Sequence, residues 1–378
     1  MNKVNVHSGW DPLEEIWLGD VWPNEFYEDL SPDVRKAFKT VTDWTKEDLS
    51  VIQETFEKFG VTVRRPQIDV NNKDKYLEPE TKRLVKPPIC LRDTNAVIGN
   101  HLFLDTPLFP DLASYYDPSC LFVPKGNLHI SGASMVKIGR DILFDSPVSE
   151  RFDTNAIFHD FSQFEKNIIE NFGNDYRLYY ATNGGHCDGC FMPIKFGVSL
   201  STEYATGYDF FLPEWETVDF RKPSFILHAP ISNGGVEWNK PKWYVPNMSG
   251  HIGPRFNEYL EQYCQAWIGN YTETYFEVNV VVIDEENLMC IGDEKNAYPY
   301  VKEIEKYGIK CHLVPFRTRA FWDGGLHCIT LDTIRRGTLK DYYPNRGSYG
   351  LKSVTSNRFA NTEDFMEQYT NWKSERGM

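Results

Sequence analysis

A helix followed by a glycine and a short strand recurs along the chain. In residues 46–63, apolar side chains at helical spacing lead to Gly60 and then to a β-branched run. Residues 161–180 and 296–316 repeat this layout, and the three junctions read EKFG, ENFG and EKYG. Glycine often ends a helix because it adopts the left-handed backbone conformation without steric cost. The pattern therefore predicts three helices, each followed by a strand.

Alternation of apolar and polar residues predicts β-hairpins between these units. Residues 95–105 turn at Gly99, and residues 134–144 turn around residues 139–141. Small or polar turn residues between two alternating runs are typical of a hairpin. Residues 279–284, with the sequence NVVVID, are predicted to form a buried strand.

The mixture of hairpins and helix-then-strand units indicates an α/β fold class. No Gly/Ser-rich linker or break in composition divides the chain, so we expect residues 1–378 to form one domain of similar modules. An ordinary open α/β sheet is the alternative architecture. The glycine-rich fingerprints of nucleotide-binding folds do not occur in the sequence.

The composition indicates a packed protein and excludes some partners. Aromatic residues make up 15% of the chain, which is typical of a globular core rather than disorder. The formal net charge of −14 argues against nucleic acid and anionic membranes, because both are polyanions. No apolar run approaches the roughly 20 residues that span a bilayer, and residues 1–15 lack the apolar core of a signal peptide. We therefore expect a cytoplasmic protein whose eight cysteines are reduced.

Residues 186–190, HCDGC, contain a C-x-x-C pair beside a histidine and an aspartate. A structural zinc site usually needs a second such pair, which the sequence lacks, so no metal is expected. A redox pair would open a helix, whereas a proline and then a glycine follow Cys190. An extended segment would direct His186 and Asp188 to one face, where they could carry a proton and bind a cation. A histidine satisfied by structural contacts is the alternative.

Two further segments hold candidate site residues. Cys328 follows Gly324 and Gly325, and glycines let the backbone approach a ligand closely. A thiol becomes a nucleophile only as thiolate, which requires a positive neighbourhood that a cationic substrate can supply. A buried structural cysteine is the alternative. Asp93 lies at the entry to a predicted strand, where it could face a cleft or cap a turn.

These segments, with two others, resemble the amidinotransferase family, within the guanidine-modifying pentein superfamily that includes arginine deiminases. The matching stretches are WDPLEEIWLGD (10–20), LRDTNAVIGN (91–100), KIGRDILF (137–144), HCDGCF (186–191) and GGLHCITLDTIRRGTL (324–339). The last is the most specific, because deiminases diverge after the cysteine. The resemblance implies a five-module α/β propeller with pseudo-fivefold symmetry and a central active site.

The resemblance also implies a mechanism. Cys328 would attack the guanidinium carbon of L-arginine while Asp93 and Asp188 hold the forked guanidinium. His186 would protonate the departing amine, giving ornithine and an amidino-cysteine, and would later take a proton from the acceptor amine. The expected activity is that of an L-arginine:amine amidinotransferase with ping-pong kinetics and no cofactor. In an extended segment His327 would point away from the cysteine, so we expect a structural role for it.

One departure from the family concerns the acid that orients the catalytic histidine. Residues 118–140 hold no Asp or Glu, and Ser131 and Ser134 stand at the matching positions. A serine can accept the imidazole N–H but does not stabilise an imidazolium as a carboxylate does. Either Ser131 takes this place, or another loop supplies the acid, or catalysis is slow.

A second departure concerns the substrate. Glycine-type amidinotransferases place an arginine downstream of the H-x-D-x-x-F motif to hold a carboxylate, but Lys195 is the cation found there. We expect Lys195, Arg317 or Arg319 to hold it. Gly184 and Gly185 leave room for an acceptor larger than glycine, as in pathways to guanidino natural products such as cyanobacterial toxins. The predicted substrate-binding residues are Ser131, Asn183, Gly185, Lys195, Arg317, Trp322 and Asp323.

Two other functions would use the same residues. If water replaced the acceptor amine, the protein would be an arginine deiminase-like hydrolase. If the orienting acid were lost, a non-catalytic guanidine-binding protein would remain. In each case the expected partners are small molecules, and a homodimer is the oligomeric state that the resemblance implies.

Overall fold

The computed structural model confirms the predicted α/β class. The residues that it describes are 2–104, 110–126, 128, 130–145, 154–181, 186–201, 211–212, 214–219, 254–264, 267, 278–292, 298–346, 352–354 and 362–378. Within them the strands form five sheets, four of three strands and one of four. None of the helices in this described part is long and apolar enough to cross a bilayer.

The five sheets share one topology, in which a central strand has an antiparallel inner partner and a parallel outer partner. Central strand β4 (His101–Leu104) pairs with inner strand β3 (Asn95–Ile98) and outer strand β5 (Leu121–Phe122). The other sheets are, in the order inner, central and outer, β15–β1–β2 (Thr330–Arg335, Leu13–Leu18, Thr62–Arg64), β6–β7–β8 (Met135–Ile138, Asp141–Asp145, Arg177–Ala181), β9–β10–β11 (Phe191–Lys195, Val198–Ser201, Glu216–Asp219) and β12–β13–β14 (Val281–Asp284, Asn287–Ile291, Lys310–Val314). A further strand, β16 (Lys352–Val354), joins β8 in parallel.

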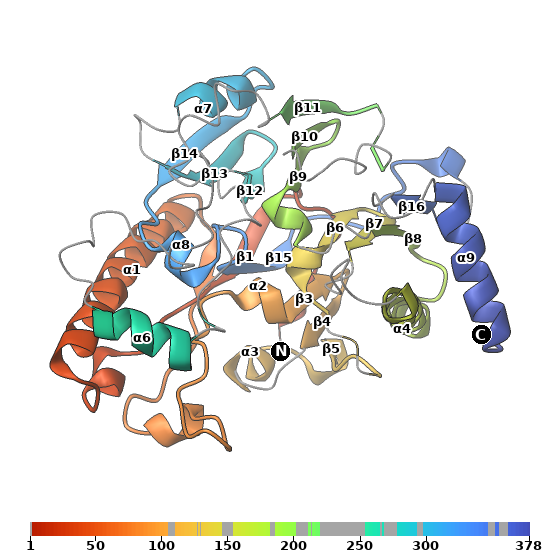
Figure 1. Ribbon diagram of the computed structural model, residues 1–378. Helices are drawn as coiled ribbons and strands as arrows, with labels where there is room; N and C mark the ends of the chain where they lie inside the picture. The colour runs from red at the N-terminus through yellow and green to blue at the C-terminus, as the bar shows by residue number, and fades with distance from the viewer. Residues whose placement is uncertain are drawn as a thin grey trace.

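The inner strands lie toward the middle of the molecule, and the outer strands β5, β8, β11 and β14 lie toward its edge (Figure 1). Helices connect central strands to outer strands, because a parallel pair needs a crossover connection. These helices are α1 (Pro32–Lys58), α3 (Pro110–Ser114), α4 (Thr154–Phe172) and α7 (Tyr298–Glu305). Gly60, Gly173 and Gly308 follow three of them with positive φ angles. The three predicted helix–glycine–strand units are thus confirmed, although α1 begins well before residue 46.

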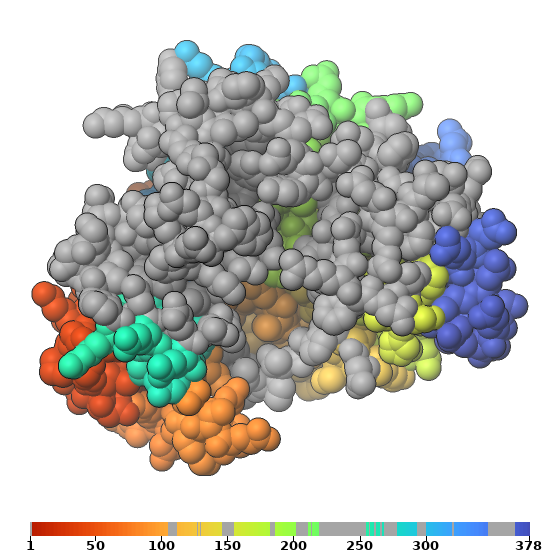
Figure 2. All heavy atoms as spheres, viewed as in Figure 1, coloured from red at the N-terminus to blue at the C-terminus, as the bar shows by residue number. Residues whose placement is uncertain are grey.

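Some of the remaining helices lie in the middle of the molecule and others lie at its edge (Figure 1). In the described residues they are α2 (Leu91–Thr94), α6 (Pro254–Tyr263), α8 (Arg319–Trp322) and α9 (Thr362–Glu375), with one-turn 3-10 helices at Asn24–Tyr27, Lys73–Tyr76, Pro118–Cys120, Gly132–Ser134, Cys187–Gly189 and Pro344–Arg346. Figure 2 shows α6 beside α1 on one edge and α9 beside α4 on another, in agreement with their contacts.

Both predicted hairpins are confirmed. Gly99 and Gly139 have φ angles of 56° and 57° and turn β3 into β4 and β6 into β7. The strand predicted at residues 279–284 is shorter than expected, since β12 begins at Val281. Asn279 therefore lies in the segment before β12 rather than in the strand itself.

The sheet β15–β1–β2 joins distant parts of the sequence. β1 pairs with β15 from Leu13–Arg335 to Leu18–Thr330, with irregular register near Glu15. Helix α1 packs behind this sheet and buries Ile52 and Phe56 in the apolar cluster that also contains Cys328. The turn before β15 consequently rests on a large core.

Candidate active site

A short turn or one-turn helix precedes each inner strand and carries a polar or nucleophilic side chain. These residues are Asp93 before β3, Ser131 before β6, Asp188 before β9, Asn279 before β12 and Cys328 before β15. Helix α2 packs against the segment 132–134, this segment packs against the segment 187–189, and α2 also contacts β15. Since the inner strands lie together in the middle of the molecule, the shared topology brings the segments that carry these residues together as one cluster (Figure 1).

Cys328 occupies the buried side of this cluster and is 3% exposed. Its sulfur lies 3.6 Å from Asp188 Oδ2, and the side-chain amide of Asn279 donates to it at 3.2 Å. Gly324 and Gly325 are required because neighbouring side chains leave no room for a Cβ atom at either position. A Cβ on Gly325 would collide with Asn279, and a Cβ on Gly324 would lie 2.7 Å from Cys90 Sγ.

The electrostatic surroundings of Cys328 favour the neutral thiol. Burial raises the pKa of this thiol well above its ordinary value, and the carboxylates of Asp188 and Asp93 raise it further. A cation that entered the cluster would offset the two carboxylates and favour the thiolate. The sulfur is thus placed to become reactive when a cationic substrate binds.

Lys86 brings one positive charge to this region. Burial lowers the pKa of Lys86, but the acidic groups of Cys90, Asp93 and Asp323 outweigh burial, so the pKa is raised. The sequence analysis missed this lysine. Its position close before Asp93 in KPPICLRD is the signal that could have drawn attention to it.

The two carboxylates differ in how they are paired. Asp188 is buried, and its Oδ2 accepts a hydrogen bond of 2.7 Å from His327 Nδ1. Asp93 Oδ1 is buried without a hydrogen-bond partner among the described residues and lies 3.8 Å from His186 Nδ1. Burial raises the pKa of Asp93, and the opposing charges of His186 and then Lys86 only partly offset this effect. Asp93 thus has free capacity to accept a donor.

The two histidines take different positions, for reasons that the sequence analysis did not anticipate. The segment around His327 is a turn rather than an extended strand, so His327 points to Asp188 and is part of the cluster. Burial, and then the nearby charge of Arg92, lowers the pKa of His327 to about 4, so it donates to Asp188 as a neutral imidazole. The expectation of an extended segment was therefore wrong, whereas the structural role expected for His327 stays a prediction.

The motif H-x-D is not extended either. His186 precedes the 3-10 helix Cys187–Gly189, which contains Asp188. The two side chains therefore face different partners: His186 faces Asp93, whereas Asp188 faces His327 and Cys328. The side chain of His186 is 40% exposed, so it can exchange protons with solvent.

Ser131 lies beside the Asp93 segment. Its hydroxyl donates to the Arg92 carbonyl at 3.3 Å and accepts from the Ala133 amide at 3.1 Å. Ser134 is fully buried, and its hydroxyl has no hydrogen-bond partner among the described residues. The carboxylate that faces His186 belongs to Asp93. The separation of 3.8 Å is longer than a hydrogen bond, so the supply of an orienting acid by another loop stays a prediction.

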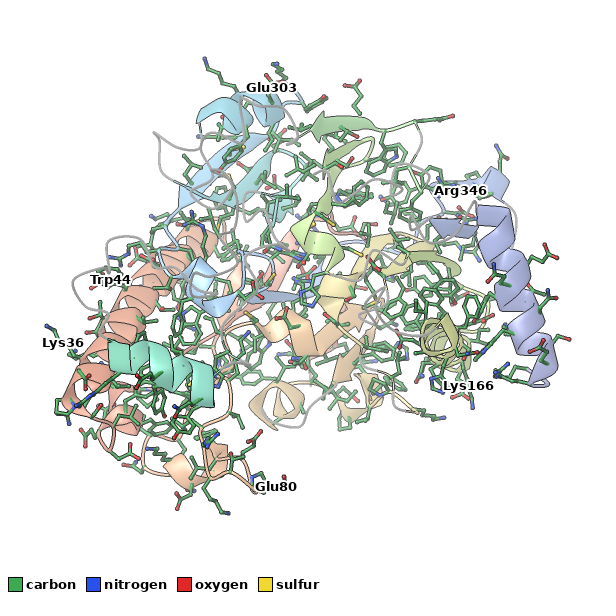
Figure 3. The ribbon with its side chains drawn as sticks, viewed as in Figure 1. Lys36, Trp44, Glu80, Lys166, Glu303 and Arg346 are labelled. Carbon is green, nitrogen blue, oxygen red and sulfur yellow. The ribbon has the colours of Figure 1, made fainter. Side chains whose placement is uncertain are left out.

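Several predicted substrate-binding residues lie away from Cys328. Arg317 binds Asp48 and Glu47 and lies over Trp44, which Figure 3 places on the outer side of α1. Trp322 is fully buried, and its indole N–H donates to Thr45.

The remaining predicted substrate-binding residues are Lys195, Asp323, Asn183 and Gly185. Lys195 ends β9 and donates to the Tyr307 carbonyl at 3.5 Å. Asp323 has a left-handed conformation with φ 52° directly before Gly324, and its charge interacts with Lys86. Asn183 and Gly185 lie outside the described residues.

The residues after Cys328 build a support for its turn. Arg92 bonds to Asp332 Oδ1 and Arg335 bonds to Asp332 Oδ2, each at 2.7 Å. Arg92 Nε also donates to the His327 carbonyl at 2.8 Å. All three charged groups are buried, and the two arginines hold the pKa of Asp332 well below its usual range although burial alone would raise it. The D-x-x-R part of the cysteine motif therefore positions the site without facing the thiol.

Comparison with known sequences gives the class to which this fold and site correspond. Inosamine-phosphate amidinotransferase 1 of Streptomyces glaucescens is 23% identical over 398 aligned residues, which cover 90% of this chain and 99% of that protein. The enzyme of the same name from Streptomyces griseus is 23% identical over 408 residues with the same coverage. Mitochondrial glycine amidinotransferase of Xenopus laevis is 36% identical over 69 residues, 18% of this chain and 16% of that protein. No family model matches the chain.

Solved structures agree on the fold. SxtG, an amidinotransferase from Microseira wollei in the saxitoxin biosynthetic pathway, matches with a TM-score of 0.61 at 18% identity, covering 90% of this chain and 99% of that one. The inosamine-phosphate amidinotransferase StrB1 of Streptomyces griseus matches with a TM-score of 0.58, the same identity and the same coverage. The chain therefore has the fold of these two amidinotransferases. Its sequence is similar to amidinotransferases over 90% of its length, which agrees with the resemblance seen in its five sequence motifs.

Proposed function

We propose that this protein is an amidinotransferase that moves the amidino group of L-arginine to an acceptor amine, with Cys328 as the nucleophile. The observation that carries the proposal is the convergence of a buried thiol with two carboxylates, one of which has an oxygen without a hydrogen-bond partner among the described residues. Such a cluster suits a guanidinium ion, whose forked N–H donors match carboxylate oxygens. The amidinotransferase relatives, which match 90% of the chain, support the same reaction class.

Binding of the guanidinium would prepare the nucleophile. Its charge offsets Asp93 and Asp188, which lowers the pKa of the Cys328 thiol, and the thiol proton passes through water to His186. The sulfur then bonds to the guanidinium carbon. The bond from this carbon to the side-chain nitrogen of the donor breaks, and His186 protonates that nitrogen to give ornithine.

The second half-reaction returns the enzyme to its starting state. The acceptor amine attacks the amidino carbon, His186 takes the proton that the amine loses, and the Cys328 thiolate departs. Because the amidino group rests on the cysteine between the two steps, the kinetics are ping-pong. Water in place of the amine would give hydrolysis instead.

The proposal also includes the arrangement of the five sheets, the residue that binds the donor carboxylate, and the kind of acceptor. The five sheets are placed about a pseudo-fivefold axis with the site at its centre, which their shared topology and central inner strands support. We infer that the donor carboxylate is held by Lys195 or Arg319 rather than by Arg317, because the Arg317 guanidinium binds the two carboxylates of Asp48 and Glu47. The acceptor is larger than glycine and belongs to the biosynthesis of a guanidino natural product.

The test is to incubate the protein with L-arginine and a panel of amines and to measure ornithine and citrulline. Ornithine that depends on the amine is expected. Citrulline formed without added amine would indicate a hydrolase rather than a transferase. If neither ornithine nor citrulline is formed, a guanidine-binding protein is favoured. Mass spectrometry after exposure to arginine is expected to find an amidino adduct on Cys328. The same adduct in Cys328→Ser protein would show that the nucleophile is a different residue.

A further inference from the structure

Asn279 stands in its sheet where the other site residues stand in theirs. It lies two residues before inner strand β12, just as Asp93 lies two residues before β3 and Cys328 two residues before β15. No functional motif of the sequence includes it. Its side chain is fully buried, and it fills the space that the missing side chain of Gly325 leaves.

The hydrogen bonds of Asn279 fix the orientation of its carboxamide. Its Oδ1 accepts the backbone N–H of His327 at 2.8 Å and that of Cys328 at 3.0 Å. Its Nδ2 donates to the Asp188 carbonyl at 3.0 Å and to Cys328 Sγ at 3.2 Å. Exchanging the oxygen and nitrogen would set amide donors against two backbone donors. The nitrogen must therefore face the sulfur.

We propose that Asn279 is a positioning residue that holds the Cys328 turn and stabilises the Cys328 thiolate through its amide N–H. The proposal rests on the role of Cys328 as nucleophile in the function proposed above. A hydrogen bond donated to the charged form of an acid favours that form. In a cluster with two carboxylates, this donor opposes the repulsion that a thiolate would meet.

The neutrality of the amide is the important chemical feature. A lysine or arginine at this position would also stabilise a thiolate, but its charge would pair with Asp188 and compete with the substrate guanidinium. An asparagine stabilises the sulfur anion and leaves the negative charge of Asp188 and Asp93 for the substrate. The sulfur therefore has a donor before substrate binds, and the substrate supplies the charge.

Asn279→Asp is the informative substitution. Aspartate has the same shape and can still accept the two backbone N–H groups, but it cannot donate to the sulfur and adds a negative charge. Asn174→Asp makes the same chemical change on an exposed turn and serves as the matched control. Circular dichroism and thermal unfolding verify the folded state of each variant.

The readout is the pH dependence of the Cys328 thiolate, which requires no arginine. The ultraviolet thiolate absorbance of each protein is compared with that of the same protein carrying Cys328→Ser, and iodoacetamide labelling of the Cys328 peptide is followed by mass spectrometry. In Asn279→Asp we expect the apparent pKa of Cys328 to rise, and labelling near neutral pH to slow about tenfold or more. Asn174→Asp is expected to behave as the parent protein.

Two outcomes would overturn the proposal. One is an unchanged Cys328 titration in folded Asn279→Asp protein, which would leave Asn279 a packing residue only. If Asn279→Asp does not fold, Asn279→Ser is used instead, because it adds no charge. An unchanged Cys328 titration in folded Asn279→Ser protein would likewise leave Asn279 a packing residue only. The other is ornithine formation by Asn279→Asp with the parent rate and pH profile. A shifted titration in a protein that forms no ornithine would instead count against the proposed reaction and leave the role of Asn279 intact.

Discussion

The two sides of the site differ in how completely their polar groups are paired. On the buried side, Cys328 is surrounded by Asp188, Asn279 and His327, and hydrogen bonds of 2.7 to 3.2 Å connect the residues around it. On the open side, Asp93 lies 3.8 Å from a partly exposed His186 and keeps an oxygen without a hydrogen bond among the described residues. Under the proposed function, folding holds the Cys328 nucleophile in place, and we expect substrate binding to complete the side that carries His186.

The largest effect is expected from removing the nucleophile on the buried side. Cys328→Ser should lower amidino transfer by more than about a thousandfold, because a serine hydroxyl that is buried beside two carboxylates does not ionise. Ornithine release measures the loss. Cys311→Ser, at a half-buried cysteine in β14, is the matched control and should retain activity. Comparable loss in both variants would indicate damage to the fold rather than to the reaction.

A smaller loss is expected on the open side. His186→Asn removes the proton carrier and should lower kcat by roughly 10² to 10⁴-fold. The amidino adduct on Cys328 should still form slowly in this variant, and mass spectrometry can detect it. His159→Asn, on the exposed face of α4, provides the control. Full activity of His186→Asn would mean that the open side does not carry the proton.

Asp188 lies on the buried side, where it is expected both to bind the substrate guanidinium and to raise the pKa of the Cys328 thiol. Its substitution should therefore weaken substrate binding but make the thiol more reactive. Asp188→Asn should weaken guanidinium recognition and lower turnover of arginine by roughly ten- to hundredfold. The same change removes a charge that raises the Cys328 pKa, so labelling by iodoacetamide should become faster. Asp74→Asn on the surface is the control. Slower labelling in Asp188→Asn would contradict this account of the thiol.

The last expected effect concerns stability rather than activity and tests whether His327 is neutral. A buried histidine with a folded pKa of about 4 contributes stability that is complete above its unfolded pKa of 6.5 and is lost as the pH falls toward 4. The shift corresponds to a loss of up to about 3 kcal/mol in the free energy of unfolding. His327→Asn can donate to Asp188 without titrating, so its unfolding free energy should fall less over this range. Denaturant titrations at several pH values measure the difference. Parallel pH profiles would show that His327 does not carry this linkage.

Local patterns in the sequence predicted the helices and hairpins well. Apolar spacing and Gly60, Gly173 and Gly308 give three helix–strand units because both signals act over a few residues. The meeting of β1 with β15 depends instead on residues more than 300 positions apart, and no local pattern reports such a pairing. The resemblance to a known family supplied what local physics could not.

The residues of the site were likewise predicted only in part. The family motifs pointed to Cys328 and Asp188, which lie together in the structure. Asn279 was missed because it begins an apolar run and was assigned to the strand that follows it. The contact of His327 with Asp188 was not predicted, because an extended segment was expected whereas residues 326–329 form a turn. Such residues become visible only when the start of each inner strand is known.

The pairing of β1 with β15 has a consequence for the order in which the protein is made. The sheet that presents the nucleophile takes its central strand from the beginning of the described chain and its inner strand from residues synthesised much later. During translation, the segments that carry Asp93 and Asp188 leave the ribosome before Cys328 does. Contacts between such distant residues also form slowly, because a long loop must close. The thiol and its carboxylates therefore come together as a late event in the life of the nascent chain, after most of the other sheets have been synthesised.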